Sequence, residues 1–123
     1  MKGYTNAIKN DLSIDGFKEI KEFEDYYINN KGVVYKIFNY KNKNSELRLV
    51  SSMKDAEDSL KANFILNGVR TTRRIKTLVY EIFNKPIDKL DKIYFIDGDT
   101  GNCDIKNLIS GTELLDYYKL NKK

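Results

Sequence analysis

Acidic, amide and hydroxyl side chains that could bind a cation are concentrated in one stretch, Asp97-Gly98-Asp99-Thr100-Gly101-Asn102. The carboxylates at its start suggest a calcium loop of the EF-hand type. Such a loop needs glycine at its sixth position and glutamate at its twelfth, where this chain has Asn102 and Leu108. The chain also contains no histidine, the side chain that most often moves protons near neutral pH. We therefore expect neither calcium nor another metal here, and no cofactor.

Several segments around this stretch follow one another in a recognisable order. They are Lys76–Phe83, Tyr94-Phe95-Ile96-Asp97-Gly98, Asn102-Cys103, Asn107-Leu108, and Thr112 with Asp116. Their order and spacing resemble the HNH endonucleases carried by phages and group I introns. In that family an apolar helix precedes a histidine-bearing strand that ends in Asp-Gly, and Asn-Asn, Asn-Leu and a helix starting at threonine follow. The resemblance implies an HNH-like ββα-metal fold for this part of the chain.

The resemblance also implies that the catalytic groups have been lost. The family's general base is a histidine that corresponds to Phe95, whose benzyl group can neither accept a proton nor bind a metal. The metal ligands correspond to Tyr94, a phenol, and to Asp116 on the last helix. We expect Asn102 and Asn107 to brace the loop by hydrogen bonds from side chain to backbone. No residue is therefore expected to be catalytic, and Tyr94, Phe95, Asn102 and Asp116 are vestigial positions; the alternative is weak residual nicking that uses Tyr94 or Asp116.

The N-terminal half resembles a second family. Phe17-Lys18-Glu19-Ile20 and the later run from Tyr26 to Tyr35 are similar to the NUMOD-type DNA-binding motif. That motif has a tryptophan near its start, a Tyr-x-Ile-Ser-Asn-x-Gly turn and a basic strand. Phe17 stands in place of the tryptophan, and Tyr35 stands where arginine is common. The resemblance implies a small DNA-binding β motif in which Lys31 and Lys36 supply a second cationic strand.

Positive charge is concentrated in the middle of the chain, although the net charge is only +4. Residues 31–76 contain eleven Lys and Arg against four acids, a net charge of +7. Residues 1–30 (four against six) and 77–123 (seven against eight) are slightly acidic. A local basic segment of this kind is typical of a nucleic-acid footprint.

A β-hairpin is predicted within the basic segment. Asn67-Gly68, the strongest short-range hairpin signal, separates two strand-like runs at 60–66 and 69–75. The second run holds three arginines, and Lys76 continues it. This hairpin is the predicted nucleic-acid contact.

Strand alternation separates these arginines into two sets. Arg70 and Arg74 share one face with Lys76 in line, whereas Arg73 points to the other. We expect Arg70, Arg74 and Lys76 to contact phosphates, which gives affinity with little sequence preference, and Arg73 to matter less. The alternative is that the arginines pair with acids of residues 11–25 inside the protein.

The other patterns predict an α+β fold, with small antiparallel β-hairpins followed by the HNH-like module and a C-terminal helix. Three segments are expected to share one core: a leader at 1–16, a NUMOD-like β motif at 17–50, and a degenerate HNH-like module at 51–123. Further predicted elements in the first half are a helical turn or loose leader at 5–12, a strand at 17–20, a hairpin of 26–28 and 33–37, and a helical turn at 53–60. In the second half they are a helix around 78–83, a strand at 92–96 and a turn at 107–108. A last helix is predicted to be capped by Thr112, with Leu114, Leu115 and Tyr118 on its apolar side.

Composition favours a cytoplasmic protein, in the host cell if a phage encodes it. The 123 residues are 41% hydrophobic, enough for a core, and no apolar run approaches the ~20 residues of a membrane span. The start of the chain lacks a signal-peptide pattern, and the single cysteine, Cys103, excludes an internal disulfide.

Two function classes fit these observations. The leading one is a phage or mobile-element protein that binds nucleic acid, with duplex DNA favoured, and does not cut it. The rival is an inhibitor that binds a host nuclease or a CRISPR effector, an anti-CRISPR-like role. The nine tyrosines suit that rival because tyrosine is enriched in protein interfaces.

Overall fold

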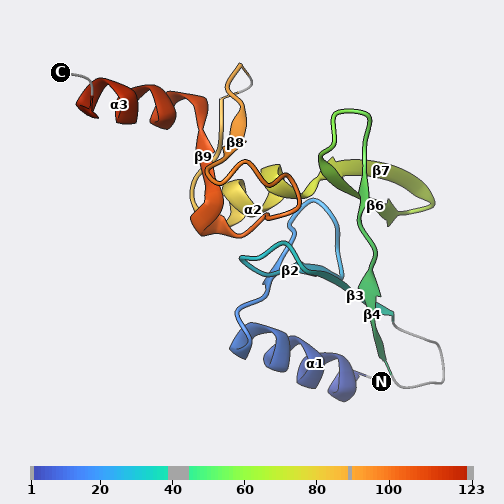
Figure 1. Ribbon diagram of the computed structural model, residues 1–123. Coiled ribbons are helices and arrows are strands. Elements are labelled where there is room, and N and C mark those ends of the chain that lie inside the picture. The colour runs from blue at the N-terminus through green and yellow to red at the C-terminus, as the bar shows by residue number, and fades with distance from the viewer. Residues whose placement is uncertain (1, 39–44, 89, 122–123) are drawn as a thin grey trace.

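The protein is an α+β fold built from small antiparallel sheets and α-helices in the computed structural model (Figure 1). The structure describes residues 2–38, 45–88 and 90–121. None of the helices in these ranges is long and apolar enough to cross a membrane. In chain order the elements are α1 (Lys2–Ile14), β1 (Lys18–Glu19), β2 (Tyr26–Ile28), β3 (Val34–Phe38), β4 (Glu46–Val50), β5 (Met53–Lys54), β6 (Leu60–Leu66), β7 (Val69–Arg74), α2 (Ile75–Phe83), β8 (Ile93–Phe95), the 3-10 turn η1 (Ile105–Asn107), β9 (Leu108–Ser110) and α3 (Gly111–Asn121).

The first sheet has the strand order β1-β2-β3-β4, and it confirms the predicted hairpin of β2 and β3. The turn is closed by Asn29, whose side-chain oxygen accepts from the backbone N–H groups of Lys31 and Val33. Gly32 has a φ of +86°, and a Cβ there would lie 2.7 Å from the Ile75 side chain. Glycine is therefore required both by the backbone and by the close approach to α2.

Helix α1 covers one face of this sheet (Figure 1). Leu12 of α1 is buried against Tyr27 and Ile37, which point to the same side of β2 and β3. The opposite face of the sheet carries Tyr26 and Ile28 into the main core. The first segment is thus an ordered helix over residues 2–14 rather than a loose leader.

The stretch between the two hairpins differs from its prediction. Residues 53–60, expected as a helical turn, form β5, a turn and the start of β6. The Asp55 carboxylate accepts from the backbone N–H groups of Glu57 and Ser59, and Asp58 adopts a positive φ of 63°. These bonds favour a reversal over a helix. Strand β4 was not predicted, and residues 39–44 lie outside the described residues.

The second hairpin, β6 and β7, is confirmed with its turn at Asn67-Gly68, where φ is 52° and 78°. Positive φ at both positions is the requirement of a type I′ turn. Strand β7 runs directly into α2: Arg74 still has extended backbone angles, and the helix begins at the next residue, Ile75. The predicted apolar stripe of α2 is confirmed, with Leu78 and Val79 buried in the core.

The C-terminal part contains a third sheet, formed by β8 and β9, and then α3. The predicted strand at 92–96 is confirmed as β8. Of the turn predicted at 107–108, Asn107 ends the 3-10 turn η1, whereas Leu108 already begins β9. The cap of α3 is Ser110, not Thr112: the Ser110 hydroxyl accepts from the Glu113 N–H, and the Glu113 carboxylate accepts from the Ser110 N–H. This reciprocal pair is a capping box. Tyr80 also donates to Glu113, which ties α2 to the start of α3.

One hydrophobic core joins the parts of the chain that carry the two family resemblances. It extends from Ile20 near the N-terminus to Leu108 in β9. Phe23 and Phe64 stack at its centre with ring centroids 4.6 Å apart. Because this core spans all three sheets, it fixes the basic hairpin relative to α2 and β8.

Candidate functional site

Phe95, the position that the HNH resemblance matches to a general base, packs against its neighbours. Phe95 is half-buried against the core, and Leu108 is its cross-strand partner in β9. The Lys76 ammonium lies over the Phe95 ring, 5.4 Å from its centroid, which is within the ~6 Å reach of a cation–π contact. Lys76 also donates to the carbonyl oxygen of Ile93 at 3.0 Å. The ring therefore faces the start of α2, not the last helix.

Lys76 is consequently an internal contact as well as a surface cation. Its burial, followed by the nearby positive charge of Arg74, lowers the pKa of Lys76 below its ordinary value. An ammonium held by a carbonyl oxygen and an aromatic ring has fewer donors left for a phosphate. Strand β7 also ends at Arg74 and Lys76 lies in α2, so Lys76 does not continue the row of Arg70 and Arg74 along the strand.

Tyr94 and Asp116 are the residues that the HNH resemblance matches to metal ligands. Tyr94 points away from Phe95, since neighbours on a strand face opposite sides, and the residue is 45% exposed. Asp116 is exposed on α3 and lines neither of the two hollows to which Tyr94 contributes. Within the described residues, no three Asp, Glu, Cys or His side chains are arranged to hold a metal ion.

The loop after β8 is braced as predicted. Asn107 donates to the Asp97 carboxylate at 2.9 Å and to the Asn102 carbonyl oxygen at 2.9 Å, and it accepts from the Asp97 N–H. Asn102 donates to the other oxygen of Asp97 at 3.0 Å. Hydrogen bonds hold the pKa of the Asp97 carboxyl below its usual range, and the bond from the Asn102 side chain has the largest effect. These side chains serve the loop, and Asp97 keeps its charge within it.

Cys103 lies beneath this loop and is buried. Burial raises the pKa of its thiol to about 11. A thiol in that state is neutral near pH 7 and is a poor nucleophile. Cys103 is therefore a core residue.

The basic hairpin presents its arginines on two faces, as strand alternation predicted. Arg73 lies opposite buried Ala62 and turns toward the core face, where it pairs with Glu22 at 2.8 Å and lies over the Phe23 ring. Arg70 lies opposite Ile65 on the outer face and is exposed.

Arg74 also lies on the outer face, but acids of its own chain hold it. Its guanidinium pairs with Asp55 at 3.0 Å and with Glu57 at 3.1 Å. The alternative that the arginines pair with acids of residues 11–25 therefore holds for Arg73, whose partner is Glu22. Arg74 also pairs inside the protein, but its acids come from the turn after β5. An arginine with two carboxylate partners offers less charge to a phosphate.

Sequence reasoning missed Lys61, which is the cross-strand partner of Arg74. It lies on the outer face because it alternates with buried Ala62 and Phe64 along β6. The same alternation could have identified it from the sequence. We call the outer face of this hairpin the basic sheet face; its members are Lys61, Asn63, Ile65, Arg70, Thr72 and Arg74.

The two lysines of the first hairpin lie elsewhere. Lys36 is on β3, and its ammonium lies over the rings of Tyr26 and Phe38 at 4.9 and 4.7 Å. Lys31 is exposed in the turn between β2 and β3. Both belong to the first sheet, so neither extends the row of Lys61 and Arg70 along the second sheet.

A cleft and a groove lie beside α2. A cleft of about 780 Å³ lies between the end of β7, the start of α2 and β8. Its charged lining contains more carboxylates than cations, so it is not a basic cleft. The acidic residues of the lining are Glu57, Glu81, Asp88 and Asp91, and the basic ones are Arg74, Lys76 and Lys92.

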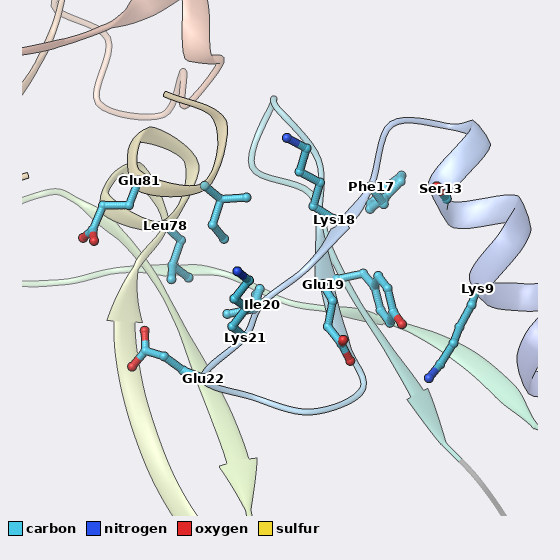
Figure 2. A pocket seen from close by; sticks show the side chains of 12 residues that line it. Lys9, Ser13, Phe17, Lys18, Glu19, Ile20, Lys21, Glu22, Leu78 and Glu81 are labelled. Atoms are coloured by element: carbon cyan, nitrogen blue, oxygen red, sulfur yellow. The ribbon is translucent and has the colours of Figure 1, made fainter. Parts of the chain in front are cut away.

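A second groove, of about 720 Å³, crosses β1 between α1 and α2 (Figure 2). Its floor is apolar, with Ile20 and Leu78 among the side chains that point into it. Three lysines and three glutamates share its walls, so charge favours neither an anion nor a cation. They are Lys9, Lys18, Lys21, Glu19, Glu22 and Glu81.

Comparison with known proteins supports the fold. The structure is similar to that reported in "DNA binding and cleavage by the HNH homing endonuclease I-HmuI", with a TM-score of 0.63 and 17% sequence identity. The similarity covers 85% of this chain and 58% of that one. At this identity the similarity establishes an HNH-like fold. No family model matches the chain, and no curated protein matches it either.

Proposed function

We propose that this chain is a catalytically inactive HNH-like protein, encoded by a phage or mobile element, that binds duplex DNA through the basic sheet face. The observation that carries the proposal is the placement of exposed Arg70 and half-buried Lys61 on one face of β6 and β7. Neither side chain has an acidic partner within residues 2–38, 45–88 and 90–121. Two such cations on a rigid sheet are able to neutralise backbone phosphates.

The polar neighbours of these cations support the same contact. The Thr72 hydroxyl donates to the Asn63 side chain at 2.7 Å, between the positions of Arg70 and Lys61. Hydroxyl and amide groups of this kind bond phosphate and sugar oxygens in protein–DNA interfaces. Arg74 joins the row more weakly, because Asp55 and Glu57 already neutralise it.

Inactivity is the second part of the proposal. The general base would have to be Phe95, which packs against the core, and the ligands Tyr94 and Asp116 offer one carboxylate between them. Mg²⁺ is not held well by one carboxylate without substrate phosphates. The I-HmuI report describes DNA binding and cleavage by that enzyme; we propose that this chain shares the binding and not the cleavage.

Salt dependence tests the binding proposal. Fluorescence anisotropy with a labelled duplex at two salt concentrations is expected to give a slope of log K against log[salt] of about −1.8, which is about 0.9 for each of two phosphates. An affinity that does not change with salt would contradict contact through phosphates.

A second candidate function is inhibition of a host nucleic-acid-targeting defence complex through protein contact. The exposed aromatic side chains of α3 favour it, because Tyr117 and Tyr118 contact each other and are largely open to solvent. Such a protein would bind its target through α3 and not through the basic sheet face.

A further inference from the structure

An apolar groove lies between α3 and the segment that leads into β8. Its volume is about 550 Å³. Leu115 and Tyr118 of α3 line it, and both are more than half exposed, as is Leu90 at 95%. We call it the α3 groove; its lining residues are Asp88, Leu90, Asp91, Tyr94, Gly111, Thr112, Leu114, Leu115 and Tyr118.

The helix that forms one wall reaches away from the rest of the fold. Figure 1 shows α3 extending beyond β8 and β9, at the opposite end of the molecule from α1. The predicted apolar side of α3 therefore does not enter the core: Leu115 and Tyr118 are exposed at 61% and 59%. Exposed tyrosine and leucine side chains that line one groove are typical of a protein interaction site.

The charge of the groove selects the class of partner. Two carboxylates, Asp88 and Asp91, line it, and among the described residues of its lining there is no Lys or Arg. Asp91 is held in place by the Thr112 hydroxyl at 2.9 Å and by the Lys92 N–H at 2.8 Å. Burial opposes its ionisation, yet these hydrogen bonds hold the pKa of Asp91 below its usual range. The described lining of the groove is thus anionic and disfavours phosphates.

We propose that the α3 groove binds a segment of a partner protein that carries aliphatic and basic side chains, such as one face of a cationic amphipathic helix. The aliphatic side chains contact Tyr94, Leu115 and Tyr118, and the basic ones pair with Asp88 and Asp91. This site is separate from the basic sheet face, so it does not depend on binding to nucleic acid; it deepens the second candidate function by giving the chemistry of the protein segment that α3 would bind.

A defined peptide tests this proposal with the full-length protein. The probe is a fluorescein-labelled amphipathic helix made of Leu and Lys, and its matched counterpart has Glu in place of Lys. We expect the Leu–Lys peptide to bind and the Leu–Glu peptide not to bind. Asp88→Lys and Tyr118→Ala are each expected to weaken binding of the Leu–Lys peptide about tenfold.

Two controls make the test specific. Glu24→Lys makes the same charge change at an exposed position outside the groove, and Ile14→Ala removes an exposed apolar side chain from α1. Both variants are expected to keep parental affinity for the peptide, and Tyr118→Ala is expected to keep parental affinity for duplex DNA.

Several results would overturn the proposal. Equal weakening by Glu24→Lys and Asp88→Lys would reveal general attraction between charges. Unchanged peptide binding in both groove variants would exclude the groove. Loss of duplex binding in Tyr118→Ala would assign the groove to nucleic acid, and self-association of the parent that Tyr118→Ala abolishes would assign it to a second copy.

Discussion

Replacing Phe95 by alanine is expected to lower the free energy of unfolding by about 3 kcal/mol, the lower end of the range for truncating a buried phenylalanine, because Phe95 is only half-buried. The ring packs against the main core and supports the Lys76 ammonium at 5.4 Å. Its removal leaves a void between β8 and the start of α2. Chemical denaturation followed by circular dichroism measures the change.

Ile96→Ala is the matched control for this substitution. Ile96 is the next residue along the chain, and its side chain is largely exposed. We expect its truncation to change stability by less than about 1 kcal/mol, as is usual for surface positions. If Phe95→Ala proves as stable as the parent, the ring does not fill the position of the base by packing.

The double substitution of Lys61 and Arg70 by alanine is expected to weaken duplex binding by about tenfold to thirtyfold at low salt, since each tenfold corresponds to about 1.4 kcal/mol. The slope of log K against log[salt] should become shallower by about 1.8, because two phosphate contacts are lost. The loss should be similar for duplexes of unrelated sequence, because phosphate contacts carry little sequence information.

Arg73→Ala is the control on the same strand. Arg73 faces the core side and already pairs with Glu22, so its removal is expected to change affinity and salt slope little. Full affinity in the Lys61 and Arg70 double variant would show that the basic sheet face is not the contact surface. The protein-binding function would then be favoured.

The faces of the basic hairpin could be predicted from local sequence, but the partners of its arginines could not. Asn67-Gly68 determines the turn, and strand alternation then separates Arg70 and Arg74 from Arg73. Glu22 lies 51 residues from Arg73 along the chain. Local patterns contain no information on such a contact, because it depends on how the two sheets pack together.

Two other differences have separate physical causes. The turn at Asp55 is stabilised by its own side-chain bonds and by Arg74, which outweigh the weak helical pattern of residues 53–60. The apolar positions of α3 were predicted, but periodicity does not tell whether Leu115 and Tyr118 meet the core or solvent. By contrast, the cap at Ser110 was readable, since serine followed three residues later by Glu113 is a capping-box signature.

The central claim, binding of duplex DNA without cutting, is tested most directly by one incubation with supercoiled plasmid and Mg²⁺ or Mn²⁺. Loss of a general base alone typically lowers a rate by about 10²–10⁴-fold. We therefore predict that the parent protein retards the plasmid on a low-salt gel and leaves it supercoiled after the protein is removed, as does Asp116→Ala. Nicking by the parent that Asp116→Ala abolishes would contradict the account.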